Sequence, residues 1–269
     1  MARRFRLYLL LSVTEREHAL QWNHCIRFVG QNMDKTIEIY NQIETRSTAE
    51  TASILVHDER DLCAMRSLLQ LMKFFDSIDE EVIPCLNRSC CRPFRRCSTL
   101  TIDRIRKVYD AVTSALETAQ SESMPSDKLR IRKSQLKELQ WAYCFILQQW
   151  LLVRIWVACF THELLDETSQ FPLMRASFAI AIAENVLEES PQLGQAALEV
   201  HGVNMIERIY DIAMGVIMAA QYQARVSGCK PSTTRIDSIL KRYFELLDRL
   251  RNGESKFMSA LQKAYESVQ

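Results

Sequence analysis

The sequence predicts an all-α fold, a single irregular bundle of about ten helices with a long buried central helix. The chain of 269 residues contains only 6 glycines and 6 prolines, whereas average usage of about 7% and 5% would give roughly thirty together. Apolar residues also recur every three or four positions along most of the chain, which is the period of an amphipathic helix. We therefore expect one helical domain over residues 1–269.

The N-terminal residues resemble the start of a signal peptide, but the cleavage site that should follow is missing. Residues 1–13 are basic and then apolar, but the apolar run is short, and charged residues follow it without a small-residue cleavage site. Thr14 and Glu17 have the spacing of a capping box, in which each side chain bonds a free backbone amide. A first helix is predicted at about residues 14–44. Its apolar stripe consists of Trp22, Ile26, Val29, Met33, Ile37 and Tyr40.

The next stretch contains two amphipathic helices separated by an irregular segment. The first is predicted at residues 62–75 and the second at residues 102–116, where Asp103 lies in the first turn and complements the helix dipole. Between them, residues 85–100 have no apolar period and contain Pro93. This segment is predicted to be a basic, cysteine-rich loop. Residues 121–127, which include a proline, are predicted to be an exposed connection.

A long helix is predicted at residues 128–166, and its second half has apolar side chains on every side. Residues 143–160 are almost apolar enough to cross a membrane. However, Gln148, Gln149 and Arg154 interrupt them, and an arginine near the bilayer centre costs about 2.5 kcal/mol or more. We therefore expect the central core helix of a protein that does not enter a membrane.

The C-terminal part is predicted to contain several shorter helices. One begins near Pro172, which suits a first helical turn, and stops at residues 188–191. Two more are divided by Gly202 and end near Gly228. A helix over residues 232–250 and a final helix over residues 257–264 complete the expected bundle.

Charge gives little indication of a nucleic-acid or membrane partner. The 34 lysines and arginines are balanced by 33 aspartates and glutamates. Basic residues do gather at residues 128–137, where they could touch phosphate, but a solvated helix face is the favoured interpretation. No direct binding to DNA is expected from this chain.

The cysteine-rich loop is the first candidate site. The 9 cysteines of the chain are scattered and odd in number, which favours reduced thiols in an intracellular protein. Arginines in the loop would favour thiolate and create a redox-sensitive patch, whereas the alternative is an inert solvated loop. A zinc site is disfavoured because no C-x₂-C pair occurs. The candidate redox or basic loop comprises Cys85, Cys90, Cys91, Cys97, Arg95 and Arg96.

The second candidate site is a set of aromatic residues on the long helix. Trp141, Trp150, Trp156 and Phe160 could line a pocket for a small ligand or a partner, because aromatic side chains line many pockets between helices. Plain core packing is the alternative at this spacing. The five histidines lack the spacing of metal ligands, so neither a metal nor another cofactor is predicted. These histidines are His18, His24, His57, His162 and His201.

An acidic stretch gives one further alternative, a helical enzyme. Asp76, Asp79 and Glu80 resemble the motif of isoprenoid synthases, in which carboxylates one turn apart bind Mg²⁺ and diphosphate. That chemistry normally requires a second acidic motif, which the sequence lacks. It also lacks a P-loop and a nucleophile elbow. We expect a protein without catalytic residues, which is not an enzyme.

Two segments resemble the regulatory part of fungal zinc-cluster (Zn₂Cys₆) transcription factors. The segment at residues 197–213 is similar to one in their C-terminal half, and residues 246–257 are similar to their closing segment. The resemblance covers about residues 130–269. It implies an all-helical domain that restrains or transmits activation. The N-terminal DNA-binding cluster of the family is absent from this sequence, as its C-x₂-C pairs are missing.

This resemblance leads to the main functional expectation. We expect a regulatory domain of a fungal transcription factor, acting in control of RNA polymerase II transcription and located in the nucleus, with the cytoplasm as the alternative. It would bind a protein partner, a second copy or a small effector, and reach DNA only through a partner or a missing domain. A truncated gene model, a fragment and a cluster-less paralogue remain open. A helical interaction scaffold outside transcription is the alternative function.

Overall fold

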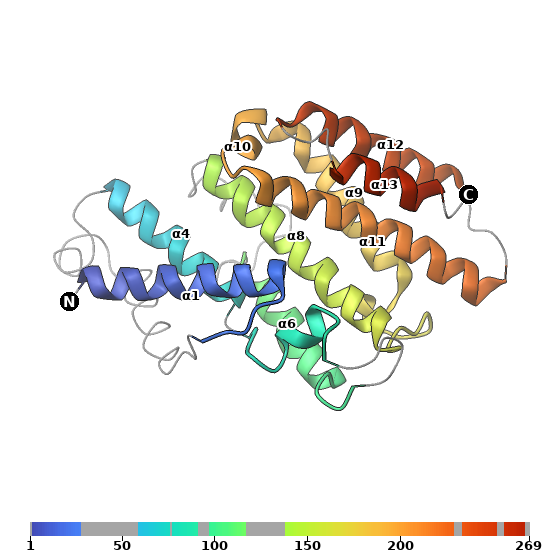
Figure 1. The fold of residues 1–269 in the computed structure, drawn as a ribbon, viewed down its shortest axis with the longest axis horizontal. Helices are drawn as coiled ribbons and strands as arrows, with labels where there is room; N and C mark the ends of the chain where they lie inside the picture. Colours follow the sequence, from blue (N-terminus) through green and yellow to red (C-terminus); the bar gives the residue numbers. More distant parts are fainter. Residues whose placement is uncertain are drawn as a thin grey trace. The chain divides into compact units, whose positions relative to one another are not determined.

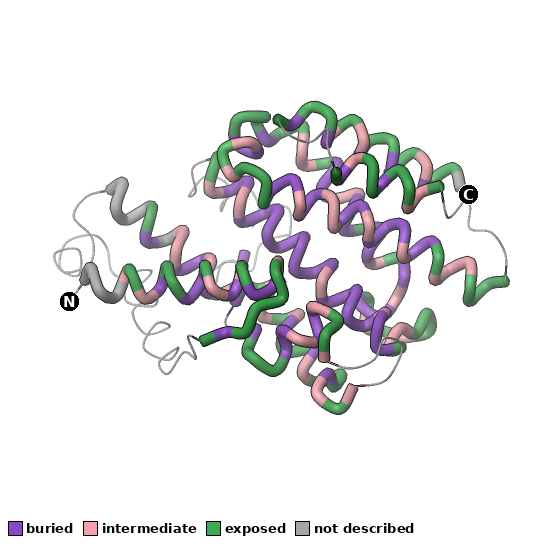
Figure 2. Tube along the Cα trace, viewed as in Figure 1, coloured by how far each residue is buried: buried purple, intermediate pink, exposed green. Residues whose placement is uncertain are grey.

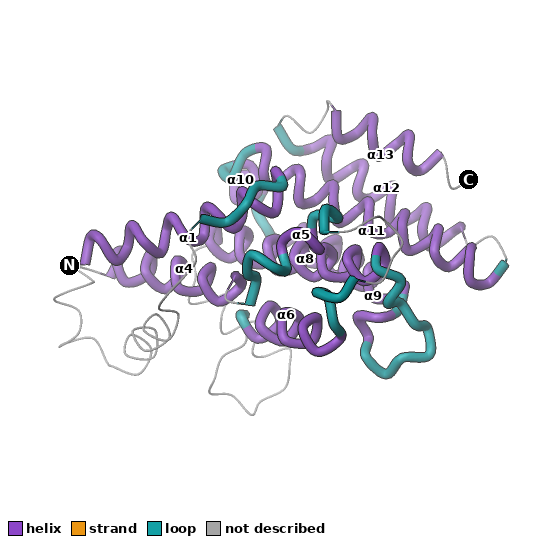
Figure 3. Tube along the Cα trace, turned by 60° about the horizontal axis from the view of Figure 1, so that its bottom comes forward, coloured by secondary structure: helices purple, strands orange, loops and turns teal. Residues whose placement is uncertain are grey.

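The protein is all-α, as the sequence predicts. The computed structural model describes residues 2–27, 59–75, 77–90, 97–116, 138–228, 233–251 and 256–266. Over these ranges it contains ten α-helices, two short 3₁₀ helices and no strand (Figures 1 and 3). The chain divides into two compact units, whereas the sequence suggested one body. Unit 1 comprises residues 1–92 and 97–136, and unit 2 comprises residues 93–96 and 137–269.

Unit 1 contains four described helices. They are α1 (Ala2–Trp22), α4 (Glu59–Phe75), α5 (Ile83–Leu86) and α6 (Ile102–Ser114). Helix α1 packs against α4 and α5, and α4 also packs against α6. The buried side chains recur every three or four residues, as amphipathic helices require. They include Leu9, Val13 and Leu20 of α1, Met65, Leu69 and Met72 of α4, and Ile105, Val108 and Val112 of α6.

The first helix begins twelve residues before its predicted start. Helix α1 runs from Ala2 to Trp22, so the predicted start at Thr14 is wrong. The Thr14 hydroxyl donates to the Leu10 carbonyl at 2.8 Å, one turn back in the same helix, instead of capping a new one. Leu9 and Val13 are buried and carry the apolar face upstream. The helix ends before Asn23, whose φ of +56° is left-handed, and residues 28–44 lie outside the described ranges.

The cysteine-rich segment starts inside a helix rather than a loop. Pro84 lies in the first turn of α5, where its missing N–H costs nothing, so Cys85 and Leu86 are helical. Residues 87–90 form a turn and residues 97–100 a bend, as expected for a loop. Residues 91–96, which include Cys91, Arg95 and Arg96, lie outside the described ranges.

Helix α8 (Glu138–Thr161) is the centre of unit 2. It packs against α9 (Ala176–Glu189), α10 (Gln195–Glu199) and α11 (Val203–Ser227). Its side chains are buried on nearly every side (Figure 2). The helix is long and apolar enough to cross a membrane, but 89% of its most apolar window is buried inside the fold. A long buried core helix is therefore present, as predicted.

The ends of α8 and α9 follow local backbone signals. Helix α8 stops at Thr161 rather than at the predicted residue 166, because Glu163 is left-handed at φ +55° and Leu164 N–H turns back to the Cys159 carbonyl at 2.9 Å. Pro172 opens a 3₁₀ turn over Pro172–Met174, and α9 begins after it. Helix α9 ends at Glu189, within the predicted stop.

The remaining helices agree with their predicted limits. Gly202 separates α10 from α11, and Gly228, at φ +66°, ends α11 in the left-handed conformation that favours glycine. Helices α12 (Thr233–Arg249) and α13 (Lys256–Glu266) pack on α11 and expose their outer faces (Figure 2). At Gly215 of α11, an added Cβ would lie 2.9 Å from Val153 Cγ1. Helices α8 and α11 therefore approach closely there.

Candidate functional site

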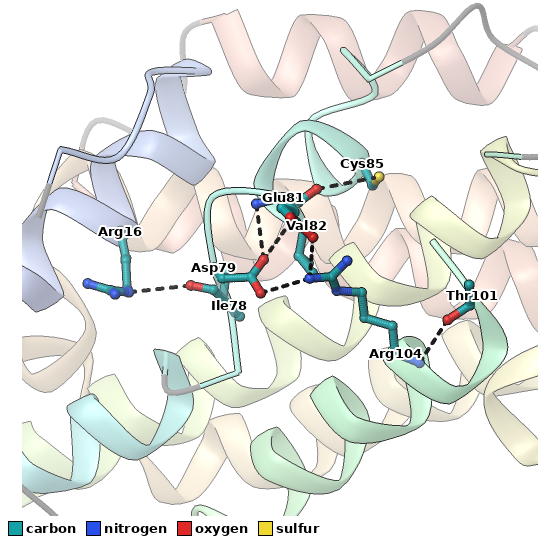
Figure 4. Close-up of polar contacts among 8 residues, drawn as sticks. All are labelled: Arg16, Ile78, Asp79, Glu81, Val82, Cys85, Thr101 and Arg104. Atoms are coloured by element: carbon teal, nitrogen blue, oxygen red, sulfur yellow. Dashed lines mark hydrogen bonds and ion pairs between the residues drawn. The ribbon is translucent and has the colours of Figure 1, made fainter. Parts of the chain in front are cut away.

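The polar turn between α4 and α5 in unit 1 is organised by Asp79. Its Oδ1 accepts hydrogen bonds from the backbone N–H groups of Glu81 at 3.0 Å and Val82 at 2.9 Å. Its Oδ2 accepts from Arg104 Nη2 at 3.0 Å, and the same nitrogen lies 2.6 Å from Glu81 Oε2 (Figure 4). Arg104 lies in the first turn of α6, three residues after Thr101. The Thr101 hydroxyl oxygen accepts a hydrogen bond from the Arg104 backbone N–H and so caps the N-terminus of α6. The turn and the start of α6 are therefore joined by charge-assisted hydrogen bonds.

Arg16 fixes the same turn from the side of α1. It is only 7% exposed. Its Nε donates to the Ile78 carbonyl at 3.3 Å (Figure 4). Its Nη1 donates to the Ser12 hydroxyl at 2.6 Å. A buried guanidinium needs several acceptors to offset its lost hydration. Here, two of those acceptors belong to different elements, so Arg16 ties α1 to the residues that precede α5.

Three cysteines gather beside this turn. Cys85 is fully buried on α5, and its Sγ donates to the Glu81 carbonyl at 3.9 Å. The Cys97 Sγ lies 3.8 Å from the Cys85 Sγ, although 12 positions separate them in the sequence. The Cys90 Sγ lies within 4.8 Å of the Cys85 Sγ. We call Cys85, Cys90 and Cys97 the thiol cluster.

The thiols of Cys85 and Cys97 differ strongly in acidity. Burial raises the pKa of Cys85 well above its usual range, and the neighbouring Cys90 and Cys97 raise it further. Burial also acts to raise the pKa of Cys97, but hydrogen bonds from Leu100 and Thr99 and from the Cys85 thiol favour its thiolate and lower the pKa to about 7. Cys97 is only half-buried. A thiolate can attack an external disulfide, and a second thiol in contact with it can then complete the thiol–disulfide exchange.

The structure therefore brings together part of the predicted redox or basic loop. Cys85, Cys90 and Cys97 converge, while Cys91, Arg95 and Arg96 lie outside the described ranges. The predicted cause of thiol acidity was the arginines of the loop. In the structure, the pKa of Cys97 is lowered instead by hydrogen bonds from the backbone of Leu100 and from the backbone and hydroxyl of Thr99. Sequence spacing gave no sign of that arrangement, because such bonds depend on the bend at residues 98–100.

The acidic stretch has a structural use in the described chain. Asp79 is engaged by two backbone amides and by Arg104, and Glu80 is exposed. Asp76 lies outside the described ranges. A carboxylate that already caps a turn and pairs with an arginine has few lone pairs left for a metal ion. This geometry gives no support to the isoprenoid-synthase alternative.

The aromatic set of unit 2 packs into the core. Trp141, Trp150 and Trp156 are at most 1% exposed. The Trp156 indole N–H donates to the Arg175 carbonyl at 2.9 Å, and its ring stacks on that of Phe160, with centroids 5.9 Å apart. Phe160 is half-buried and meets Tyr222 edge to face. Such contacts are those of packed aromatic side chains, which was the alternative to a ligand pocket.

Sequence reasoning missed a charged group in the core of unit 2. Arg208 of α11 is 0% exposed. Its guanidinium carbon lies 4.8 Å from the centre of the Tyr143 ring and 5.3 Å from that of the Trp150 ring. The Trp150 indole N–H donates to Asp211 Oδ2 at 2.8 Å, close to a second arginine, Arg154. One signal could have found Arg208: it interrupts the apolar stripe of α11.

Comparisons with known proteins found no relative. No protein-family model matches the chain, and no match was found among curated proteins or solved structures. The resemblance to zinc-cluster factors expected from the two sequence segments therefore stays a prediction.

Proposed function

We propose that the chain is a regulatory domain of the kind found in fungal zinc-cluster transcription factors, acting without its own DNA-binding cluster. The support is the position of the two resembling segments. Residues 130–269 carry the resemblance, and unit 2 covers nearly the same stretch, residues 137–269. The resembling part is thus a compact unit with its own core.

The two resembling segments also lie side by side, although more than thirty residues separate them in the sequence. Glu199 Oε1, in the first segment, accepts from the backbone N–H of Arg251, in the second, at 3.0 Å. The ring of Tyr210 meets that of Phe257 at a centroid distance of 5.3 Å. These contacts between the two segments are the observation that carries the proposal. Two short segments that resemble one family are expected to pack together when both belong to one structural unit.

The proposed mechanism is regulation by binding. Unit 2 fills its core with the side chains of α8, α9 and α11 and exposes the outer faces of α12 and α13. Those faces would contact a protein partner or a second copy, and a small effector could shift the balance between bound states. DNA would be reached through a partner or a further domain. The protein would act in the nucleus on RNA polymerase II transcription.

The test uses the full chain in its own cells. We expect a tagged copy to enter the nucleus, and deletion of the gene to change a defined set of transcripts. Phe257→Ala should reproduce part of that change, because loss of a buried ring costs about 3–5 kcal/mol and loosens the contact between the two segments. Lys263→Ala is the matched control, since Lys263 is an exposed residue on the same helix.

Two results would contradict the proposal. Exclusion from the nucleus together with unchanged transcripts would remove it. Recovery of purely cytoplasmic partners would instead favour the alternative, a helical scaffold outside transcription.

A further inference from the structure

The thiol cluster brings together two cysteines whose sulfur atoms need only a small movement to bond. The Sγ atoms of Cys85 and Cys97 are 3.8 Å apart, at van der Waals contact. A disulfide bond is about 2.05 Å long, so side-chain rotation and a small backbone shift would close the gap. Cys85 is held on α5, and Cys97 lies in the bend before α6. The pair therefore links two elements of unit 1.

We propose that Cys85 and Cys97 form a reversible disulfide, and that their oxidant is a low-molecular-weight disulfide such as glutathione disulfide. This modification site is independent of the function proposed above. It would make unit 1 responsive to the thiol–disulfide balance of its surroundings.

The chemistry proceeds in two exchanges. The Cys97 thiolate attacks one sulfur of glutathione disulfide, which forms a mixed disulfide on Cys97 and releases one glutathione thiolate. Cys85 then loses its proton to solvent and attacks the Cys97 sulfur, which forms the Cys85–Cys97 bond and releases the second glutathione. Two protein thiols are oxidised, and one glutathione disulfide is reduced to two glutathione molecules.

The surroundings of the two cysteines decide which one attacks the oxidant and which one attacks the mixed disulfide. Cys97 is half-buried and can meet the oxidant, and its pKa of about 7 places a substantial fraction as thiolate at neutral pH. Cys85 is fully buried and protonated, so it is out of reach of a bulky oxidant. Its contact with Cys97 gives the second exchange the proximity of an intramolecular reaction.

Oxidation would also change the polar turn. The single Cys85 thiol hydrogen can bond to the Glu81 carbonyl or to the Cys97 sulfur, and a disulfide has no such hydrogen to donate. Glu81 also pairs with Arg104, which belongs to α6 (Figure 4). The modification therefore acts on the contacts that join the turn to α6.

The test is mass spectrometry of the reduced full chain after incubation with excess glutathione disulfide at neutral pH. Acid quenching and alkylation would preserve the thiol state. Trypsin cleaves after Arg88 and Arg96, so Cys85, Cys90 and Cys97 fall on three different peptides. We expect one linked pair, residues 74–88 joined to residues 97–104, which disappears when glutathione is added in excess.

Single variants separate the two steps. Cys85→Ser, or Cys85→Ala if the serine misfolds, should accumulate the mixed disulfide on Cys97. Cys97→Ser should remove both the adduct and the linked peptide. Cys25→Ser, which changes an exposed cysteine outside the thiol cluster, is the matched control and should form the linked peptide at an unchanged rate. Cys90→Ser should still form the linked peptide between Cys85 and Cys97. Circular dichroism checks that each variant is folded.

Alkylation rates give an independent measurement. The rate at Cys97 should reach half its maximum near pH 7, with exposed Cys25 as an internal comparison. Three results would overturn the proposal: no linked peptide with glutathione disulfide in excess, a linkage to Cys90 instead of Cys97, or a Cys97 that gains no adduct in the folded Cys85 variant.

Discussion

Arg208 is an arginine held entirely within the core of a helical unit. Its guanidinium lies over the rings of Tyr143 and Trp150, and its Nη2 donates to the Tyr143 hydroxyl at 3.3 Å. Cation–π contact of this kind is worth roughly 0.5–2 kcal/mol, and the methylene stem adds apolar packing. Much of what Arg208 supplies is therefore volume between two aromatic rings.

Truncation of Arg208 should cost more than its replacement by a long apolar residue. Arg208→Ala should lower the free energy of unfolding by about 2–4 kcal/mol, because it leaves a cavity between the rings. Arg208→Met should recover most of that loss, since buried charges are often replaced by apolar residues of similar volume without penalty. Urea unfolding followed by circular dichroism would measure both variants. An equal loss in the two would show that the charge, rather than the volume, is required.

Sequence patterns could identify some single residues as candidates, but they could not predict the surroundings that the fold gives those residues. The redox candidates Cys85, Cys90 and Cys97 were identified from composition, and the fold brings them together. The low pKa of Cys97 could not be foreseen, because it depends on backbone N–H groups that converge through a bend. Arg208 interrupts the apolar stripe of α11, but it passed unnoticed because the helical period alone does not distinguish a buried arginine from an exposed one beside the stripe.

At the scale of elements, a single carboxylate holds the turn before α5. Asp79→Ala should destabilise unit 1 by about 1–2 kcal/mol, because two backbone N–H groups and Arg104 lose their acceptor. Asp79→Asn keeps a side-chain oxygen for the amides and should cost less. Glu80→Ala, at the exposed neighbouring position, is the control. Thermal unfolding curves would contradict this account if Asp79→Ala and Glu80→Ala gave the same midpoint.

Helices α9 and α12 are joined by an ion pair whose contribution should depend on pH. Arg235 donates to both carboxylate oxygens of Glu184, at 2.8 and 2.7 Å. The hydrogen bond from Arg235 lowers the pKa of Glu184 below its ordinary value of 4.5. Because the folded pKa is the lower one, the pair stabilises the fold fully above about pH 4.5. That stabilisation is lost as the pH falls through the folded pKa.

Glu184→Gln should therefore destabilise the protein at pH 7 by about 0.5–1 kcal/mol, a modest value because Arg235 is 62% exposed. The difference from the wild type should shrink as the pH is lowered below 4.5. Glu188→Gln, at an exposed position on the same helix, should leave stability unchanged at both ends of the range. Denaturant unfolding at several pH values would measure this, and a difference that grows on acidification would reverse the assigned sign.

For the whole molecule, the helical period predicted the fold class and the boundaries of most C-terminal helices. Helix boundaries were predicted wrongly where a local sequence signal disagreed with the tertiary packing. Thr14 had the chemistry of a helix cap, but the buried faces of Leu9 and Val13 carried α1 through it. The division into two units was also hidden, because periodicity describes each helix alone and not which helices share a core.

The burial of α8 has a consequence for synthesis of the protein on the ribosome. Its main packing partners, α9, α10 and α11, all follow it in the chain. Residues 162–227 must therefore be translated after α8 before these partners are complete, which takes several seconds at about 5–20 residues per second. We expect that during this interval the nascent α8, which is long and apolar enough to cross a membrane, lacks the partners that bury it in the fold. It would attract chaperones and the membrane-targeting machinery, so the yield of folded protein should depend on translation rate.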